Sequence, residues 1–155
     1  MNRQLRHFLV KEIVKFLNEH TGIQEYEDAC SFNVFINIIL KDTNCIVETL
    51  IPALVYIKRI INRPCKIGDI YRSHSNDMIK VLSCQRKLFV VSLVIAFKYI
   101  CEECRYMNYQ FIELIETNIE EFNLYEMVLL HLLEHRLEIG PHEYLEMKKT
   151  IGLFT

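Results

Sequence analysis

Glycine and proline are scarce in this chain of 155 residues, which contains only 4 and 3 of them. Because these residues form tight turns and interrupt helices, their scarcity favours long helices joined by few turns. Basic residues are not in excess either, since the formal net charge is −2 and the basic clusters are short and scattered. A nucleic-acid-binding surface needs concentrated positive charge, so we do not expect nucleic acid to be the main partner.

Long hydrophobic runs are also missing. The longest apolar run, Leu88 to Phe97, is interrupted by Ser92 and is too short for the roughly 20 residues that cross a bilayer. Residues 1–20 carry charges throughout and contain no apolar secretory segment. We therefore expect no membrane association and an intracellular location, in the nucleus, the cytoplasm or both. The six cysteines should then be reduced thiols.

Helical periodicity of apolar residues extends along nearly the whole chain, in which 51% of the residues are hydrophobic. This pattern predicts one all-α domain with a substantial core. Ser31 and Thr43 are candidate N-caps of the second and third helices. Pro52 should either kink the third helix or mark a later start near Thr49. The predicted helices cover residues 2–20, 31–41, 44–62, 83–102, 108–116, 119–135 and 143–150, and a polar connection at 65–82 holds a short helical turn at 77–82.

The chain contains no motif that indicates catalysis or a cofactor. Cys101 and Cys104 have the spacing of a metal-ligand pair, but no second pair accompanies them. His131 and His135 are spaced to share one face of a helix, but they lack the zincin arrangement and a third ligand. We therefore expect no enzyme activity, no metal ion and no cofactor.

Two ionisable residues interrupt apolar segments. Lys98 lies near the end of the apolar fourth helix, and Glu126 shares a helical stripe with Leu129, Leu130 and Leu133. Because an unpaired buried charge is costly, the simplest interpretation pairs Lys98 with Glu126. The pair is either a purely internal ion pair or the edge of an apolar surface that a partner completes. Apolar residues on more than one face of the helix that carries Glu126 strengthen the second alternative, because exposed apolar patches usually mark binding surfaces.

Three segments, at residues 53–60, 86–98 and 106–108 with 119–137, resemble conserved regions of one family, the cyclins, and among cyclins they most resemble the phosphate-regulon type of fungi. Ala53 to Ile60 (ALVYIKRI) resembles the AL-Y-DR helix of the family, and Arg86 to Lys98 (RKLFVVSLVIAFK) resembles its central helix. Tyr106 to Asn108, followed by Ile119 to Leu137, resembles its last conserved region. Lys98 then falls on the family's lysine, and the glutamate 28 positions later falls on the family's glutamate.

This resemblance implies a five-helix cyclin box at residues 23–145, preceded by an extra N-terminal helix at 1–22. A short C-terminal helix leads into a tail at 146–155. Cyclins bind a cyclin-dependent protein kinase and activate it, so the chain is expected to be a monomer on its own or a heterodimer with that kinase. In the family, the lysine and the glutamate hydrogen-bond to backbone at the C-helix of the kinase, while apolar side chains pack on that helix, and the kinase supplies the chemistry. The partner-binding residues that the resemblance implies are Lys98, Glu126, Leu130, Leu137, Tyr99 and His135.

The chain departs from the family pattern at several points. Lys58 replaces the aspartate of the AL-Y-DR helix, and Asn37 or Ile38 replaces the arginine that usually pairs with it. Both ends of that ion pair are therefore missing together, which leaves no stranded buried charge. The first helix lacks the MRAIL docking motif, and the connection at 65–82 is longer than usual. The alternatives are a cyclin-fold adaptor in transcription, a helical scaffold that activates no kinase, and a helical enzyme.

Overall fold

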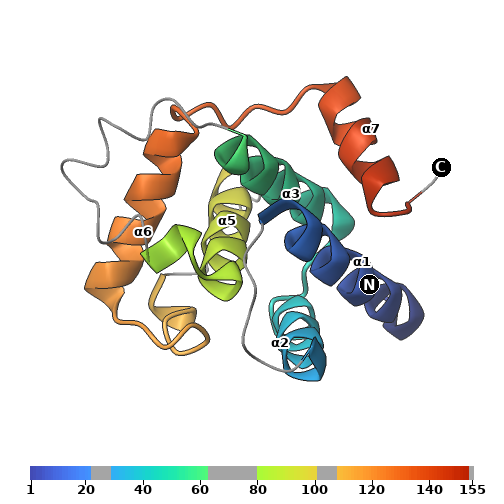
Figure 1. Ribbon diagram of the computed structural model, residues 1–155, viewed down its shortest axis with the longest axis horizontal. Coiled ribbons are helices and arrows are strands. Elements are labelled where there is room, and N and C mark those ends of the chain that lie inside the picture. Colours follow the sequence, from blue (N-terminus) through green and yellow to red (C-terminus); the bar gives the residue numbers. More distant parts are fainter. Residues whose placement is uncertain (22–28, 63–79, 101–107, 154–155) are drawn as a thin grey trace.

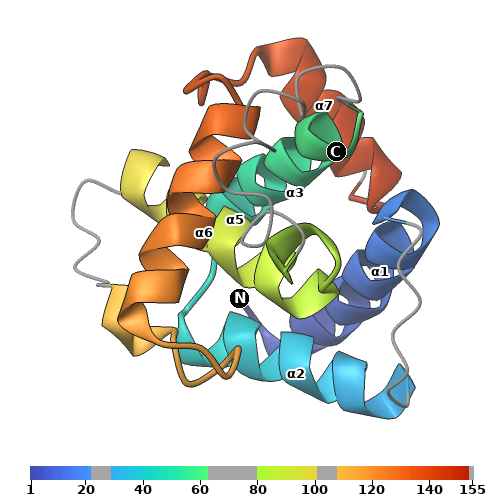
Figure 2. The ribbon, with the colours of Figure 1, turned by 60° about the vertical axis from the view of Figure 1, so that its left-hand side comes forward.

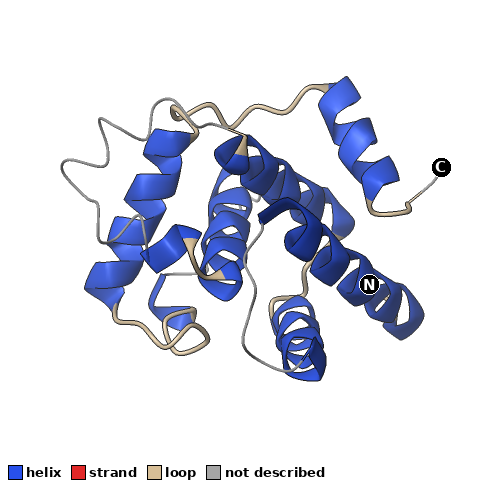
Figure 3. Ribbon diagram, in the orientation of Figure 1, coloured by secondary structure: helices blue, strands red, loops and turns tan. Residues whose placement is uncertain are grey.

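The computed structural model describes residues 1–21, 29–62, 80–100 and 108–153, and all regular structure in these ranges is helical (Figure 3). The all-α prediction is confirmed for this part of the chain. None of the helices described is both long and apolar enough to cross a membrane. The pair Cys101 and Cys104 and most of the connection predicted at 65–82 lie outside the described residues, although residues 80–82 are helical.

Long helices follow the predicted ranges closely over most of the chain (Figure 1). A short 3-10 helix, η1, lies between α5 and α6 in the sequence. The bounds are α1 Arg3–Thr21, α2 Ala29–Asp42, α3 Val47–Ile61, α5 Gln85–Ile100, η1 Asn108–Gln110, α6 Ile119–Leu132 and α7 Pro141–Thr150.

Helix α5 forms the centre of the bundle, because its apolar sequence can be buried on every side. Every residue from Leu88 to Phe97 is buried, and α5 contacts both α3 and α6, as Figure 2 shows. Helix α1 packs on α2 and α3, and α7 packs on α3. Leu9 and Ile13 of α1 and Met147 of α7 belong to the same continuous core as α5. The two terminal helices are therefore part of one packed unit.

Two predicted N-caps have other roles. Ser31 lies inside α2, and its hydroxyl accepts a hydrogen bond from the Arg86 guanidinium (3.2 Å). The Thr43 hydroxyl donates to the Ile39 carbonyl (2.6 Å), which also accepts from the Thr43 amide (3.1 Å). The hydroxyl is thus bonded to the end of α2, and the residue at the N-cap of α3 is Ile46. Helix α3 begins after this turn, at Val47.

The course of α3 excludes the later helix start near Thr49 that was one of the two alternatives for Pro52. The helix starts at Val47, before Thr49, and Pro52 lies inside it. Pro52 is buried, as are all residues from Thr49 to Ile57. Packing of this apolar segment against α5 thus maintains the helix across a residue that cannot donate a backbone hydrogen bond.

The prediction of an α-helix at 108–116 is wrong. Only η1 is helical there, and hydrogen-bonded turns follow it as far as Glu116, which adopts a positive φ of 50°. Helix α6 is shorter than predicted and ends at Leu132. Glu134 and His135 adopt positive φ values of 54° and 56°, a backbone conformation that ends a right-handed helix.

Candidate partner-binding surface

Lys98 and Glu126 meet at an exposed edge between α5 and α6. The Lys98 ammonium donates to both Glu126 carboxylate oxygens, at 3.0 and 2.8 Å, so the two isolated charges are paired as predicted. The Lys98 side chain is 42% exposed and the Glu126 side chain is 17% exposed. A pair that is open to solvent contributes little to folding stability, about 0–1 kcal/mol. Its position therefore leaves both residues accessible to a partner.

The sequence around each residue explains why the pair forms at this place. Lys98 is the first exposed residue after the buried run that ends at Phe97, and a positive charge in the last turn of a helix interacts favourably with the helix dipole. Glu126 lies between the buried residues Tyr125 and Val128 of α6. Contact between α5 and α6 then brings the two side chains together.

Two asparagines extend this pair into a polar network. The Lys98 ammonium also donates to Asn108 Oδ1 (2.7 Å), and Asn108 Nδ2 donates to Asn123 Oδ1 (2.6 Å). Asn108 comes from η1 and Asn123 lies one turn before Glu126 on α6. Sequence reasoning missed both asparagines as site residues. The available signal was the spacing of Asn123 and Glu126, which places them on the same helix face.

A hollow of about 610 Å³ is lined by residues from the ends of α3 and α5 and from the segment that follows α6. Three of the predicted partner-binding residues, Tyr99, His135 and Leu137, line it together. Tyr99, which follows Lys98 directly in the last turn of α5, is 47% exposed. The remaining lining residues are Arg59, Leu133, Arg136 and Glu138.

Side chains of α3 hydrogen-bond to three consecutive backbone carbonyls of the segment between α6 and α7, residues 133–140. The Tyr56 hydroxyl donates to the Leu137 carbonyl (2.7 Å). The Arg59 guanidinium donates to the carbonyls of Arg136 (2.9 Å) and Glu138 (2.8 Å). Figure 1 shows this segment passing α3 on its way from α6 to α7. Burial raises the pKa of Tyr56 to about 12, so the hydroxyl stays protonated and can donate well into the alkaline range.

Sequence reasoning missed Tyr56 and Arg59 as residues that shape the site. Both lie in the segment that resembles a cyclin helix, but the resemblance assigns them no contact with residues 133–140. The available signal was Arg59 itself, a fixed charge at the end of a helix that is otherwise almost entirely apolar. Such a residue needs polar partners nearby, although the sequence does not say which ones.

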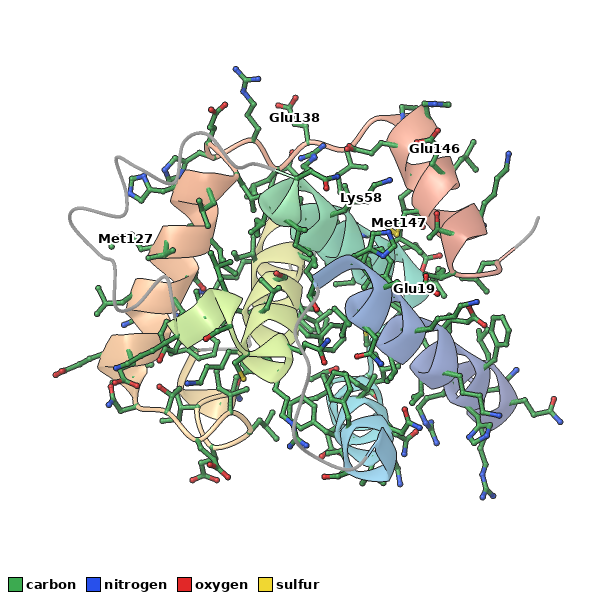
Figure 4. All side chains as sticks on the ribbon, in the orientation of Figure 1. Glu19, Lys58, Met127, Glu138, Glu146 and Met147 are labelled. Carbon is green, nitrogen blue, oxygen red and sulfur yellow. The ribbon has the colours of Figure 1, made fainter. Side chains whose placement is uncertain are left out.

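The outer face of α6 is less apolar than predicted. Phe122, Tyr125 and Val128 are buried, whereas Met127 and Leu130 are only partly exposed. Figure 4 shows where Met127 lies on α6. Leu130 packs against the core yet retains some exposed surface. The described residues of α6 thus offer a narrow apolar strip beside the ion pair, not a broad patch.

His131 and His135, whose spacing raised the question of a metal site, form none with other described residues. The rings of His131 and His135 approach edge to face, with their centroids 5.1 Å apart. No group of three or more histidine, cysteine, aspartate or glutamate residues that could hold a metal ion occurs in the described ranges. The two imidazoles instead contact each other, and that of His135 also lines the hollow.

A second exposed ion pair joins Lys80 to Glu121 in the first turn of α6. The Lys80 ammonium donates to the Glu121 carboxylate at 3.4 Å. A hydrogen bond from the Thr117 hydroxyl (2.8 Å) and the contact with Lys80 lower the pKa of Glu121 below its usual 4.5. This pair is partly exposed, as is that of Lys98 and Glu126, but it lies at the opposite end of α6 from the residues that line the hollow. It therefore provides a control for variants of Lys98 and Glu126.

Comparisons with known proteins assign no family to the chain. No family model matches it, and neither curated proteins nor solved structures give a match. The functional conclusion therefore depends on the residues and the geometry described above.

Proposed function

We propose that this chain is a cyclin-type regulatory subunit that binds a cyclin-dependent protein kinase and stabilises its active conformation. The observation that carries the proposal is the exposed ion pair of Lys98 and Glu126. A hollow whose lining includes Tyr99, His135 and Leu137 supports it, because Tyr99 comes from the same last turn of α5 as Lys98. The five-helix box would comprise α2, α3, α5, the η1 region and α6, with α1 and α7 added at the ends. The chain would act inside the cell, and the bound kinase would supply all the chemistry.

The geometry suggests how a helix of the kinase would bind. Glu126 has oxygen lone pairs beyond those used by Lys98, so it can accept hydrogen bonds from backbone amides. Lys98 can exchange its bond with Asn108 for one with a backbone carbonyl of the partner. Apolar side chains of the partner helix would pack on Leu130 and enter the hollow beside Leu137. Binding one of two kinase conformations more tightly then shifts the population toward that state.

The test is a binding and activation assay with purified cyclin-dependent kinases that carry no cyclin. We expect at least one kinase to bind the chain and to gain activity. The double variant Lys98→Ala with Glu126→Ala should lose binding, whereas the control Lys80→Ala with Glu121→Ala should retain it. Binding without activation would favour the helical scaffold, and binding to no kinase of the set would refute the proposal.

A further inference from the structure

One side chain, Arg59 of α3, joins three separate parts of the molecule. Its Nε atom donates to the Glu143 carboxylate of α7 (3.1 Å), and Nη2 contacts the other oxygen of that carboxylate. Nη1 donates to the Arg136 carbonyl and Nη2 to the Glu138 carbonyl, at 2.9 and 2.8 Å. The planar fork of an arginine can make these bonds at the same time, which a lysine ammonium cannot match in geometry.

Tyr56 completes this arrangement. It precedes Arg59 by one helical turn, so both side chains leave the same face of α3. Its buried hydroxyl donates to the Leu137 carbonyl (2.7 Å), which lies between the two carbonyls held by Arg59. We call Tyr56, Arg59 and Glu143 the carbonyl clamp.

The segment held by the clamp needs such support. Glu134 and His135 adopt positive φ values, which cost energy for residues other than glycine and persist only where the surroundings enforce them. The amides of Glu134, His135 and Arg136 donate to carbonyls at the end of α6. Beyond Arg136, residues 137–140 have no helical structure, so the clamp adds hydrogen bonds with α3 to the packing of Leu137 and Ile139 against the core.

We propose that the carbonyl clamp consists of positioning residues that fix the wall of the partner-binding hollow, and that Glu143 makes this wall depend on the docking of α7. The inference rests on the proposed function in so far as the hollow receives a kinase. His135 and Leu137 line the hollow and lie on the clamped segment. Holding them in place before binding reduces the conformational entropy lost when the partner docks. Loss of the contact with Glu143 would then loosen residues 136–138, which line the hollow.

The test compares two glutamates of α7. Glu143→Ala removes the carboxylate that orients Arg59, whereas the control Glu146→Ala removes one that pairs with His142 on the same helix (3.1 Å). Hydrogen exchange of the amides at 134–136 reports the order of the segment in the free protein. We expect exchange to become at least about tenfold faster in Glu143→Ala, as local opening would require. Exchange should remain unchanged in Glu146→Ala and, for both variants, in the buried part of α5.

A second, milder variant controls for general unfolding. Tyr56→Phe removes only the hydroxyl that holds Leu137 and should also accelerate exchange at 134–136, although less than Glu143→Ala. Unchanged exchange in both variants would overturn the inference.

Kinase affinity gives the second measurement for the same variants. With a cyclin-dependent kinase that binds the wild-type chain, Glu143→Ala should weaken binding about tenfold, the effect of one or two lost hydrogen bonds. Faster exchange with unchanged affinity would show that the clamp does not serve binding and would overturn the inference. If no kinase binds the wild-type chain, the proposed function fails, while the exchange data still decide whether the clamp fixes the segment.

Discussion

Exchanging the charges of Lys98 and Glu126 distinguishes a structural role of this ion pair from a role in binding. In Lys98→Glu or Glu126→Lys alone, two like charges face each other, and in the double exchange the pair can form again with reversed orientation. The native pair is 42% and 17% exposed, so its loss should cost about 1 kcal/mol or less of folding stability. We expect the unfolding midpoint in urea to fall slightly in each single variant and to recover in the double exchange.

Binding should respond differently, because a partner that donates to Glu126 and accepts from Lys98 would meet the wrong charge at each position. Removing one member of a charge pair that becomes buried on binding costs on the order of 2 kcal/mol or more, which corresponds to about thirtyfold in affinity. All three variants, the double exchange included, should therefore lose kinase binding in calorimetry. Recovery of both stability and affinity in the double exchange would refute a contact between these residues and the partner.

Three further predictions concern the fold. Gly152→Ala should destabilise the protein by about 1–2 kcal/mol in urea unfolding, because Gly152 has a φ of 79° and a Cβ there would lie 2.9 Å from the Phe8 ring. Gly140→Ala, where a Cβ meets nothing within 4 Å, should leave the free energy of unfolding almost unchanged. Equal destabilisation by the two alanine variants would contradict this explanation. Phe89→Ala, at a fully buried position of α5, should cost about 3–5 kcal/mol, and a cost below 1 kcal/mol would show that α5 is not the centre of the core. Burial raises the pKa of the Cys45 thiol from its usual 9.0 to about 12, so the unfolded chain ionises first and the free energy of unfolding should fall as pH rises from about 9 to about 12. Cys45→Ala should reduce this fall, and an identical pH dependence in the variant would disprove the assignment.

The positions of Lys98 and Glu126 could be predicted from the sequence because charges are rare in the segments that contain them. An apolar helix excludes charge from most positions, so each exception demands a partner, and few candidates exist. The same reasoning predicts the burial of α5, where residues 88–97 contain no ionisable side chain. Composition and periodicity are sufficient to predict where a residue lies when burial permits only one arrangement of the helix that carries it.

The clamp and the asparagine network could not be predicted in this way. Tyr56 and Arg59 hydrogen-bond to carbonyls about 80 residues later in the chain, and every residue offers a carbonyl, so the sequence contains no sign of which ones are held. Asn108 and Asn123 are common polar residues whose side chains bond only because η1 lies against α6. Such contacts depend on tertiary packing and not on local pattern.

The helix ends were mispredicted for a related reason. Thr43 has the chemistry of an N-cap, but the Ile39 carbonyl lies within its reach and competes for the hydroxyl. The helix predicted at 108–116 has helical periodicity, yet its first residue bonds to Lys98 and Asn123. Local propensity is weak enough for such tertiary contacts to override it.

Two exposed apolar side chains on α2 offer a rival candidate for the binding face, because Val34 and Ile38 lie one turn apart and are 52% and 41% exposed. The most direct test of the central claim is therefore a hydrogen-exchange footprint of the chain with a cyclin-dependent kinase bound. We expect protection at the C-terminal end of α5, along α6 and at residues 133–138, with α2 unchanged. Protection confined to α2, with no change around Lys98 and Glu126, would contradict it.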